Sequence, residues 1–249
     1  MPTRDERQRR QHDEELDLAR RLMVLPLSVA SSTSSRWSVE TFQKWPESVG
    51  ATLVASETRP DSVFRIHLAQ TYGPGLVARV LLTQCSLELL RRTEGVDLVP
   101  LNNYYLRHRP HDQSFVAAAT LAFDRDEPKW SGSFAGIDAP VAVDALGRVI
   151  PNSGMGPFLG LAETTFPILS GQLPPGGRLF IVGGAGANHR MEMLREHLAD
   201  TQNWSLTELV ERLGRELTTE LDPAFGFVLI GVERNGACLP LPAPDADVE

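Results

Sequence analysis

The sequence has little cysteine and no long apolar run. Its only two cysteines, Cys85 and Cys238, cannot build a disulfide framework or a cysteine-based zinc site. No apolar run approaches the ~18 residues that a membrane-spanning helix needs. Residues 1–15 also lack the apolar core of a signal peptide. We therefore expect a cytoplasmic protein without a membrane partner.

The sequence also lacks an excess of basic residues. Acidic residues outnumber basic ones by 32 to 24, which gives a net charge of −8. Nucleic-acid-binding domains normally carry a basic excess, so this charge argues against a nucleic-acid partner. The 249 residues suffice for one large domain or two small ones with a substantial core.

An amphipathic helix is predicted in residues 1–27. Leu18, Leu22 and Leu25 recur at helical spacing and form one apolar stripe. Pro26 ends this pattern. The polar segment 28–35, SVASSTSS, is typical of a flexible linker. We expect the helix to be tethered to the main domain and available for pairing.

After the linker, strand-like and helix-like segments come in runs rather than in strict alternation. Strands are predicted at 36–45, 50–57, 62–73, 114–124, 129–137 and 225–233, with a hairpin in 139–152 and two further strands in 163–184. Helices are predicted at 75–92, 99–109, 189–200 and 205–221. Ser205 and Glu208 form a capping box at the start of the last helix. This order predicts an α+β fold with antiparallel sheets.

A glycine-rich turn at 183–186 follows an apolar strand in LFIVGGAGAN, as it does in phosphate-binding loops. The dinucleotide fingerprint G-x-G-x-x-G lacks its third glycine here, and no Gly-Lys-Ser/Thr sequence follows. A plain turn therefore explains this segment better than a nucleotide site, although a sensor that uses the turn stays open.

No catalytic constellation is evident from the polar residues alone. His108 and His111 lie in a polar, proline-containing segment that is typical of a solvated loop, and His67 fits either the core or an exposed strand face. Asp124 and Asp126 belong to an acidic turn, which normally binds only water. Ser153 lacks the Gly-x-Ser-x-Gly context of a nucleophile elbow.

Several segments, in order, resemble the PPM-type metal-dependent protein phosphatases, especially the bacterial SpoIIE/RsbU branch. EELDLARRLMVLPL (14–27) is similar to the helix ELxxARxIQxxLLP that precedes the catalytic domain. WPESVGATLVAS (45–56) resembles P-x-E-V-G-G-D-x-x-D, and FRIHLAQTYGPGLVARVLL (64–82) resembles G-D-V-S-G-H-G and its helix. GMGPFLGL (154–161) is similar to G-x-P-L-G, and LPPGGRLFIVGGAGAN (173–188) resembles L-x-P-G-D-x-L-L-L-Y-T-D-G.

The resemblance implies a sandwich of two antiparallel β-sheets flanked by helices. It also implies phosphoserine or phosphothreonine hydrolysis by two Mn²⁺ or Mg²⁺ ions that aspartates hold. In this chain the resemblance places non-acidic residues at the aspartate positions, with only Asp222 near the last two. These positions are Thr52, Ala55, Gln70, Gly184, Pro223 and Ala224.

We therefore expect a pseudophosphatase with no metal, no cofactor and no catalytic residues. The PPM/SpoIIE-like domain is expected at 36–236, followed by a disordered acidic tail at 237–249. The resemblance implies a protein partner such as a STAS-type regulator or a switch kinase, and a homodimer through the N-terminal helix. Candidate partner-binding residues are Leu18, Leu22, Leu25, Tyr72 and Pro74.

An active phosphatase with unusual ligands remains an alternative hypothesis. Its metal ligands would be drawn from Asp61, Asp124, Asp126 and Asp222. The small-molecule or nucleotide sensor that uses residues 183–186 is the other alternative.

Overall fold

The structure is a computed structural model. Besides residues 6, 10, 13–15 and 18, it describes residues 32–33, 36–44, 52–58, 63–73, 75–108, 114–150, 154–184, 187–198, 204–219 and 227–235.

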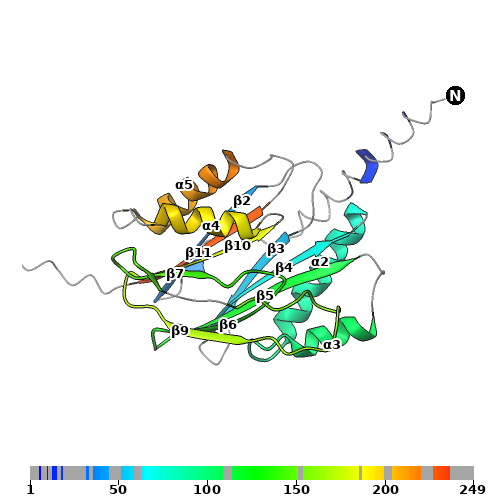
Figure 1. The fold of residues 1–249 in the computed structure, drawn as a ribbon, viewed down its shortest axis with the longest axis horizontal. Helices are drawn as coiled ribbons and strands as arrows, with labels where there is room; N and C mark the ends of the chain where they lie inside the picture. Colours follow the sequence, from blue (N-terminus) through cyan, green and yellow to red (C-terminus); the bar gives the residue numbers. More distant parts are fainter. Residues whose placement is uncertain are drawn as a thin grey trace, which may run out of the picture.

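Two antiparallel sheets form the centre of the molecule (Figure 1). In the first, six strands lie in the order β1 (Ser32–Thr33), β2 (Trp37–Lys44), β11 (Phe227–Arg234), β10 (Arg178–Gly184), β7 (Val141–Val143) and β8 (Val149–Ile150). In the second, five strands lie in the order β3 (Thr52–Thr58), β4 (Val63–Tyr72), β5 (Phe115–Asp124), β6 (Lys129–Ala135) and β9 (Ile168–Gln172). The expected α+β sandwich is confirmed.

Helices cover the outer faces of both sheets. The five-stranded sheet carries α2 (Leu76–Arg92) and α3 (Val99–Arg107), and the six-stranded sheet carries α4 (Ala187–His197) and α5 (Leu206–Thr219) (Figure 1). The capping box at the start of α5 is present, because Glu208 accepts hydrogen bonds from the backbone N–H and hydroxyl of Ser205. None of the described helices is long and apolar enough to span a membrane.

The main core lies between the sheets and follows from the two-residue period of the strands. Ile66 and Leu68 of β4 are fully buried against Ile181 of β10 and Val228 of β11. Alternate residues point the other way, and Ala69 belongs instead to the cluster beneath α2 and α3. Each strand therefore presents one set of side chains to the opposite sheet and a second set to the helices.

The N-terminal segment touches the domain at the start of α2. Residues 13–15 are helical, and the Oε1 atom of Glu15 accepts a hydrogen bond from the backbone N–H of Val77 at 3.4 Å. Leu18 is exposed, whereas Leu22 and Leu25 of the expected stripe lie outside the described residues. In the segment assigned to a linker, β1 pairs with Ser38 and Val39 of β2.

Candidate functional site

Three of the positions at which the resemblance implies lost aspartates meet between the two sheets. Thr52, the first residue of β3, lies directly opposite Gln70 on β4 as a cross-strand pair. Both residues are buried, with relative exposures of 1% and 3%. Gly184 ends β10 on the facing sheet, and its backbone N–H donates a hydrogen bond to Oε1 of Gln70 at 2.8 Å. The Gln70 amide therefore joins the two sheets at this point.

Close packing accompanies this contact between the sheets. A Cβ atom at Gly183 would lie 2.7 Å from Cδ2 of Leu68 and 3.3 Å from Cγ2 of Thr52, so a side chain at position 183 would force the buried Leu68 to shift. The next residue, Gly184, has φ 127°, a conformation that favours glycine. The hydroxyl of Thr52 is buried and has no hydrogen-bond partner among the residues that the structure describes. We refer to Thr52, Gln70 and Gly184 as the inter-sheet site.

An aromatic cluster adjoins the inter-sheet site. Tyr72 is half-buried on β4, two residues beyond Gln70, and its ring meets that of Phe158 edge to face at 5.4 Å. Burial raises the pKa of Tyr72 to about 12, and a hydrogen bond with Gln70 partly offsets this rise. Phe115, which pairs with Tyr72, lies 6.0 Å from Phe158 between ring centroids and is 37% exposed.

The structure does not bring the other expected positions into this site. Ala55 of β3 faces the opposite way and packs in the cluster that includes Leu87 and Leu90 of α2. Thr52 and Ala55 are three positions apart in the strand, and this odd spacing places their side chains on opposite faces. Pro74, Pro223 and Ala224 lie outside the described residues, as do positions 185 and 186 of the glycine-rich turn.

The inter-sheet site has the wrong atoms for a pair of Mg²⁺ or Mn²⁺ ions. Such ions are held by several oxygen ligands, among which carboxylates supply the compensating charge. Here one hydroxyl and one amide oxygen are present, the amide oxygen already accepts the N–H of Gly184, and the glycine offers no side chain. Within the described ranges, no three His, Cys, Asp or Glu residues lie close enough to hold a metal ion.

Sequence reasoning did not identify the buried polar network around His67. His67 is fully buried on the helix side of β4, with Nδ1 2.9 Å from the hydroxyl of Thr120 and Nε2 3.5 Å from Glu57. Glu57 also lies 3.6 Å from the guanidinium of Arg91 on α2. Because the histidine is inaccessible to solvent, the network acts in packing α2 onto the sheet. The available signal was a histidine with an apolar residue on each side, Ile66 and Leu68, in a strand sequence.

The acidic turn lies at the opposite end of the five-stranded sheet. Asp124 pairs with Val63, whereas Gln70 pairs with Ala117, so the two positions are about 23 Å apart along the strands. The Oδ1 atom of Asp124 accepts the backbone N–H groups of Asp126 and Glu127 at 2.8 and 3.0 Å. These hydrogen bonds lower the pKa of Asp124 and hold its carboxylate in the turn.

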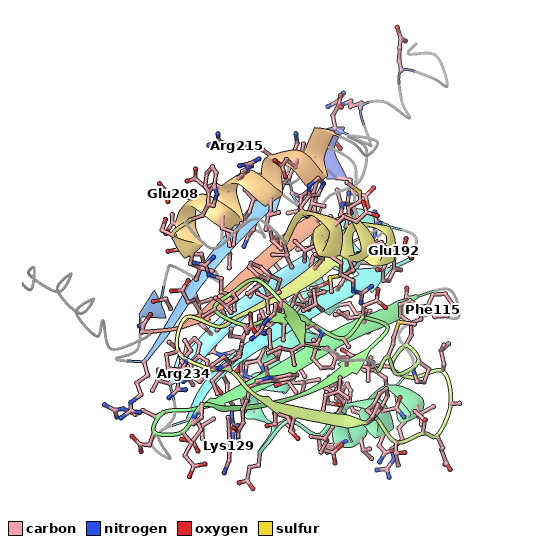
Figure 2. All side chains as sticks on the ribbon, turned by 60° about the vertical axis from the view of Figure 1, so that its left-hand side comes forward. Phe115, Lys129, Glu192, Glu208, Arg215 and Arg234 are labelled. Atoms are coloured by element: carbon pink, nitrogen blue, oxygen red, sulfur yellow. The ribbon has the colours of Figure 1, made fainter. Side chains whose placement is uncertain are left out.

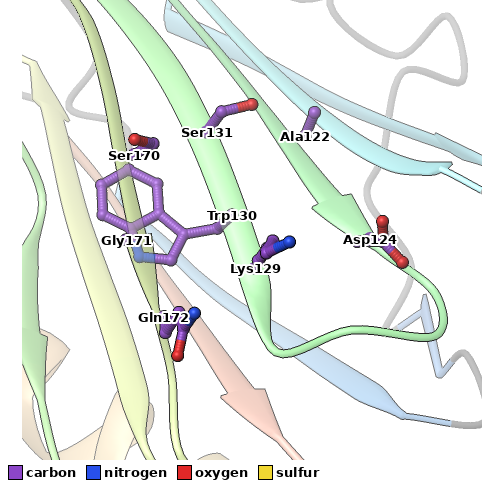
Figure 3. Close-up of a pocket in the computed structure, with 8 residues that line it drawn as sticks. All are labelled: Ala122, Asp124, Lys129, Trp130, Ser131, Ser170, Gly171 and Gln172. Carbon is purple, nitrogen blue, oxygen red and sulfur yellow. The ribbon is translucent and has the colours of Figure 1, made fainter.

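An open cavity of about 480 Å³ lies beside this turn (Figure 3). It is lined by Ala122, Asp124, Lys129, Trp130, Ser131, Ser170, Gly171 and Gln172. The acidic turn thus forms one end of an open trough with a mixed polar and apolar lining, remote from the inter-sheet site. His108, the other polar candidate within the described residues, is exposed at the end of α3 and stacks on Tyr104.

No family model matches the sequence, and no curated protein is significantly similar to it in sequence. Solved structures do match. RsbX in complex with magnesium aligns with a TM-score of 0.62 and 13% identity over 84% of this chain and 100% of RsbX. The SiaA-PP2C domain of Pseudomonas aeruginosa aligns with a TM-score of 0.61 and 15% identity over 95% of this chain and 100% of that domain.

SpoIIE from Bacillus subtilis, in a structure of its PP2C phosphatase domain and a fragment of its regulatory domain, aligns with a TM-score of 0.64. The identity is 13%, over 82% of this chain and 64% of that one. The chain has the PPM phosphatase fold. At this level of identity the likeness shows the PPM fold alone. The expected resemblance is thereby confirmed at the level of fold.

Proposed function

We propose that this chain is a catalytically inactive member of the PPM fold that acts as a protein-binding regulator. In this proposal the sandwich is retained, the two-metal chemistry is lost, and the partner is a phosphorylatable STAS-type regulator or its switch kinase. The single observation that carries the proposal is the hydrogen bond from Gly184 to Gln70. It places a neutral amide between the sheets where the resemblance implies metal-binding carboxylates.

The inter-sheet site supports inactivity because its polar atoms are neutral. Two adjacent divalent cations need several anionic ligands to offset their charge. Gln70 and Thr52 carry no charge at any pH, and Gly184 contributes only a backbone N–H that points at Gln70. The former metal positions therefore act as a structural connection between β4 and β10.

The aromatic cluster supports a role in protein binding. Phe115 is 37% exposed and packs against Phe158, which in turn packs against Tyr72 beside the inter-sheet site. Exposed aromatic residues that rest on a rigid apolar base are enriched in protein interfaces. Figure 2 shows Phe115 at the edge of the molecule. A partner would contact this aromatic cluster. The cluster adjoins the inter-sheet site, which a phosphorylated segment of the partner would approach in an active phosphatase.

The alternative of an active phosphatase with unusual ligands receives less support. Asp124 lies about 23 Å from Gln70, measured along the strands of the five-stranded sheet. Its carboxylate is held by turn N–H groups. Asp61 and Asp222, two further candidate ligands, lie outside the described residues.

The decisive experiment combines Mn²⁺ titration calorimetry with hydrolysis of a serine-phosphorylated STAS-domain protein. We expect no metal binding at millimolar Mn²⁺, no phosphate release, and measurable binding of the STAS-domain protein. Turnover that is abolished by EDTA would show that the chain is an enzyme and would end the proposal.

A matched pair of variants tests whether the partner binds at the aromatic cluster. Phe115→Ser removes the exposed ring and should weaken the complex by at least about tenfold, as expected for an interface anchor. Lys129→Ser removes an exposed side chain at the opposite end of the sheet and should leave affinity unchanged. Equal effects of the two variants would place the partner elsewhere on the surface.

A further inference from the structure

The two sheets have four edge strands, and three of them are protected against pairing with another chain. Within the part of the chain that the structure describes, β1 and β8 at the edges of the six-stranded sheet are each two residues long. β3 at one edge of the five-stranded sheet has its first four residues buried. Short length and burial are established ways of preventing edge-to-edge association.

The fourth edge strand, β9, has none of these protections. Its five residues, Ile168–Gln172, read ILSGQ and contain no charge and no proline. Ile168 is 56% exposed. Among the residues that the structure describes, the backbone of β9 pairs only with β6, so its other side offers free N–H and C=O groups. An edge of this kind is a template for one more strand.

The chain leaves the six-stranded sheet next to the end of β9. The guanidinium of Arg234, the last residue of β11, donates to the carbonyl of Leu173 at 3.1 Å, and Leu173 directly follows β9. The carbonyl of Arg234 accepts the N–H of Gly176 at 2.9 Å. Figure 2 shows Arg234 on the same side of the molecule as Lys129 and away from Phe115. Residues 236–249 therefore start within a few residues' reach of β9.

The sequence of this terminal segment is suited to pairing on one side only. Residues 238–244 read CLPLPAP, with proline at every second position. Each proline fixes φ near the extended region, and each residue before a proline is driven towards extended conformations. In an antiparallel strand the N–H and C=O of one residue point to the same side. In such a strand, Leu239, Leu241 and Ala243 would direct their backbone N–H and C=O groups to one neighbouring strand. The backbone of the prolines would face the opposite, outer edge.

We propose that residues 238–244 pair antiparallel with β9 as a sixth strand of the five-stranded sheet. The segment starts at the Gln172 end of β9 and runs towards Ile168, covering the exposed isoleucine. Its alternating prolines then block the new outer edge, because they lack the N–H that a further strand would need. In this proposal the chain's own C-terminal segment covers the sheet edge, an alternative to the expected disordered tail.

Amide hydrogen exchange of β9 tests this proposal in the full-length chain and in a chain that ends at Asn235. The shortened chain keeps Asn235, whose N–H donates to the carbonyl of Arg36, and unchanged thermal unfolding would confirm that its core is intact. We expect β9 amides that face the open edge to exchange at least about fivefold faster after shortening, as for the loss of a typical hydrogen bond. Identical exchange in both chains would overturn the proposal.

A pair of double variants distinguishes strand pairing from a polyproline helix bound elsewhere. Leu239→Pro/Leu241→Pro removes the donors that would face β9, so protection should be lost although proline content rises. Pro240→Ala/Pro242→Ala leaves those donors in place, so protection should persist. The reverse pattern would overturn the proposal. So would β9 protection that survives shortening and increases with protein concentration, because a second copy would then cover the edge.

Discussion

The two ends of the five-stranded sheet use their polar residues in opposite ways. At one end Thr52 and Gln70 are neutral and buried, and Gln70 reaches across to the other sheet. At the other end Asp124 is charged, but its carboxylate serves its own turn. The abundance of acids at one end therefore does not by itself indicate a metal or catalytic site there. The end where strands of both sheets converge carries neutral groups at positions where the resemblance implies carboxylates.

This contrast follows from what each environment tolerates. Between the sheets an isolated carboxylate would lose its hydration, so the site must be neutral unless metal ions compensate the charge. In the turn, water and backbone N–H groups solvate a carboxylate without any partner from another element. A neutral residue at this place is compatible with the fold when it satisfies a nearby backbone group, as Gln70 does for the N–H of Gly184.

The largest effect is expected from restoring carboxylates at both members of the buried cross-strand pair. Thr52→Asp/Gln70→Asp places two like charges in the core and should lower the free energy of unfolding by about 3–5 kcal/mol in EDTA. Millimolar Mn²⁺ should recover part of this loss, because an ion that binds only the folded state stabilises it. Urea unfolding with and without Mn²⁺ measures both changes.

The matched control is another cross-strand pair, Ser131→Asp/Ser170→Asp, which lies on the open trough. We expect it to cost less than about 1 kcal/mol, because water solvates both charges there. If Mn²⁺ stabilises both double variants equally, or neither, the interpretation of positions 52 and 70 as former ligand positions is contradicted.

A smaller effect is expected from removing the amide that joins the sheets. Gln70→Leu keeps the approximate volume of the side chain but leaves the N–H of Gly184 without its acceptor, which should cost about 1–3 kcal/mol. Gln172→Leu makes the same chemical change at an exposed position of β9 and should change stability by less than about 0.5 kcal/mol. If the two variants shift the urea midpoint equally, the hydrogen bond between the sheets contributes nothing to the free energy of unfolding.

The smallest effect concerns the acidic turn and depends on pH. Hydrogen bonds from Glu127 and Asp126 lower the pKa of Asp124 in the folded protein. Its carboxylate therefore stabilises the fold above the unfolded-state pKa of about 3.9, and this contribution is lost as the pH falls through the lower folded-state value. Asp124→Asn should lower stability by less than about 1 kcal/mol at pH 7, and the difference should vanish in strong acid.

Asp126→Asn is the control for this measurement, since it removes a neighbouring charge without touching the acceptor Oδ1 of Asp124. Urea midpoints at neutral pH and near pH 3 would compare the two variants with the unmodified chain. A difference for Asp124→Asn that grows on acidification would have the wrong sign for a carboxylate with a lowered pKa.

Local patterns allowed most elements to be predicted. The hairpins β3–β4 and β5–β6, the four helices of the domain and the capping box at Ser205 appear close to where spacing and turn residues placed them. These features depend on interactions between residues near in sequence, which a single sequence displays directly. The resemblance added the arrangement of two sheets, which local patterns do not specify.

The candidate site was predictable only in part. The resemblance selected Thr52, Gln70 and Gly184, and the structure brings these three together. It also selected Ala55, which the strand pleat turns towards α2. The pairing of Ser32 and Thr33 with β2 was missed because a serine-rich segment carries no strand pattern of its own.

By itself the sequence determined the positions of the elements, the charge balance and the absence of acids at the expected ligand positions. Hydrophobic periodicity, turn residues and composition depend only on residues near one another in sequence, so the sequence alone displays them. Only the tertiary structure decided that Gln70 meets Gly184 across 114 positions of sequence and that Asp124 lies at the far end of the sheet. It also decided that β9 is an edge strand, paired with β6 alone among the described residues. The physical reason is that these features depend on which strands pair and in which register, and register is set by the packing of both sheets together.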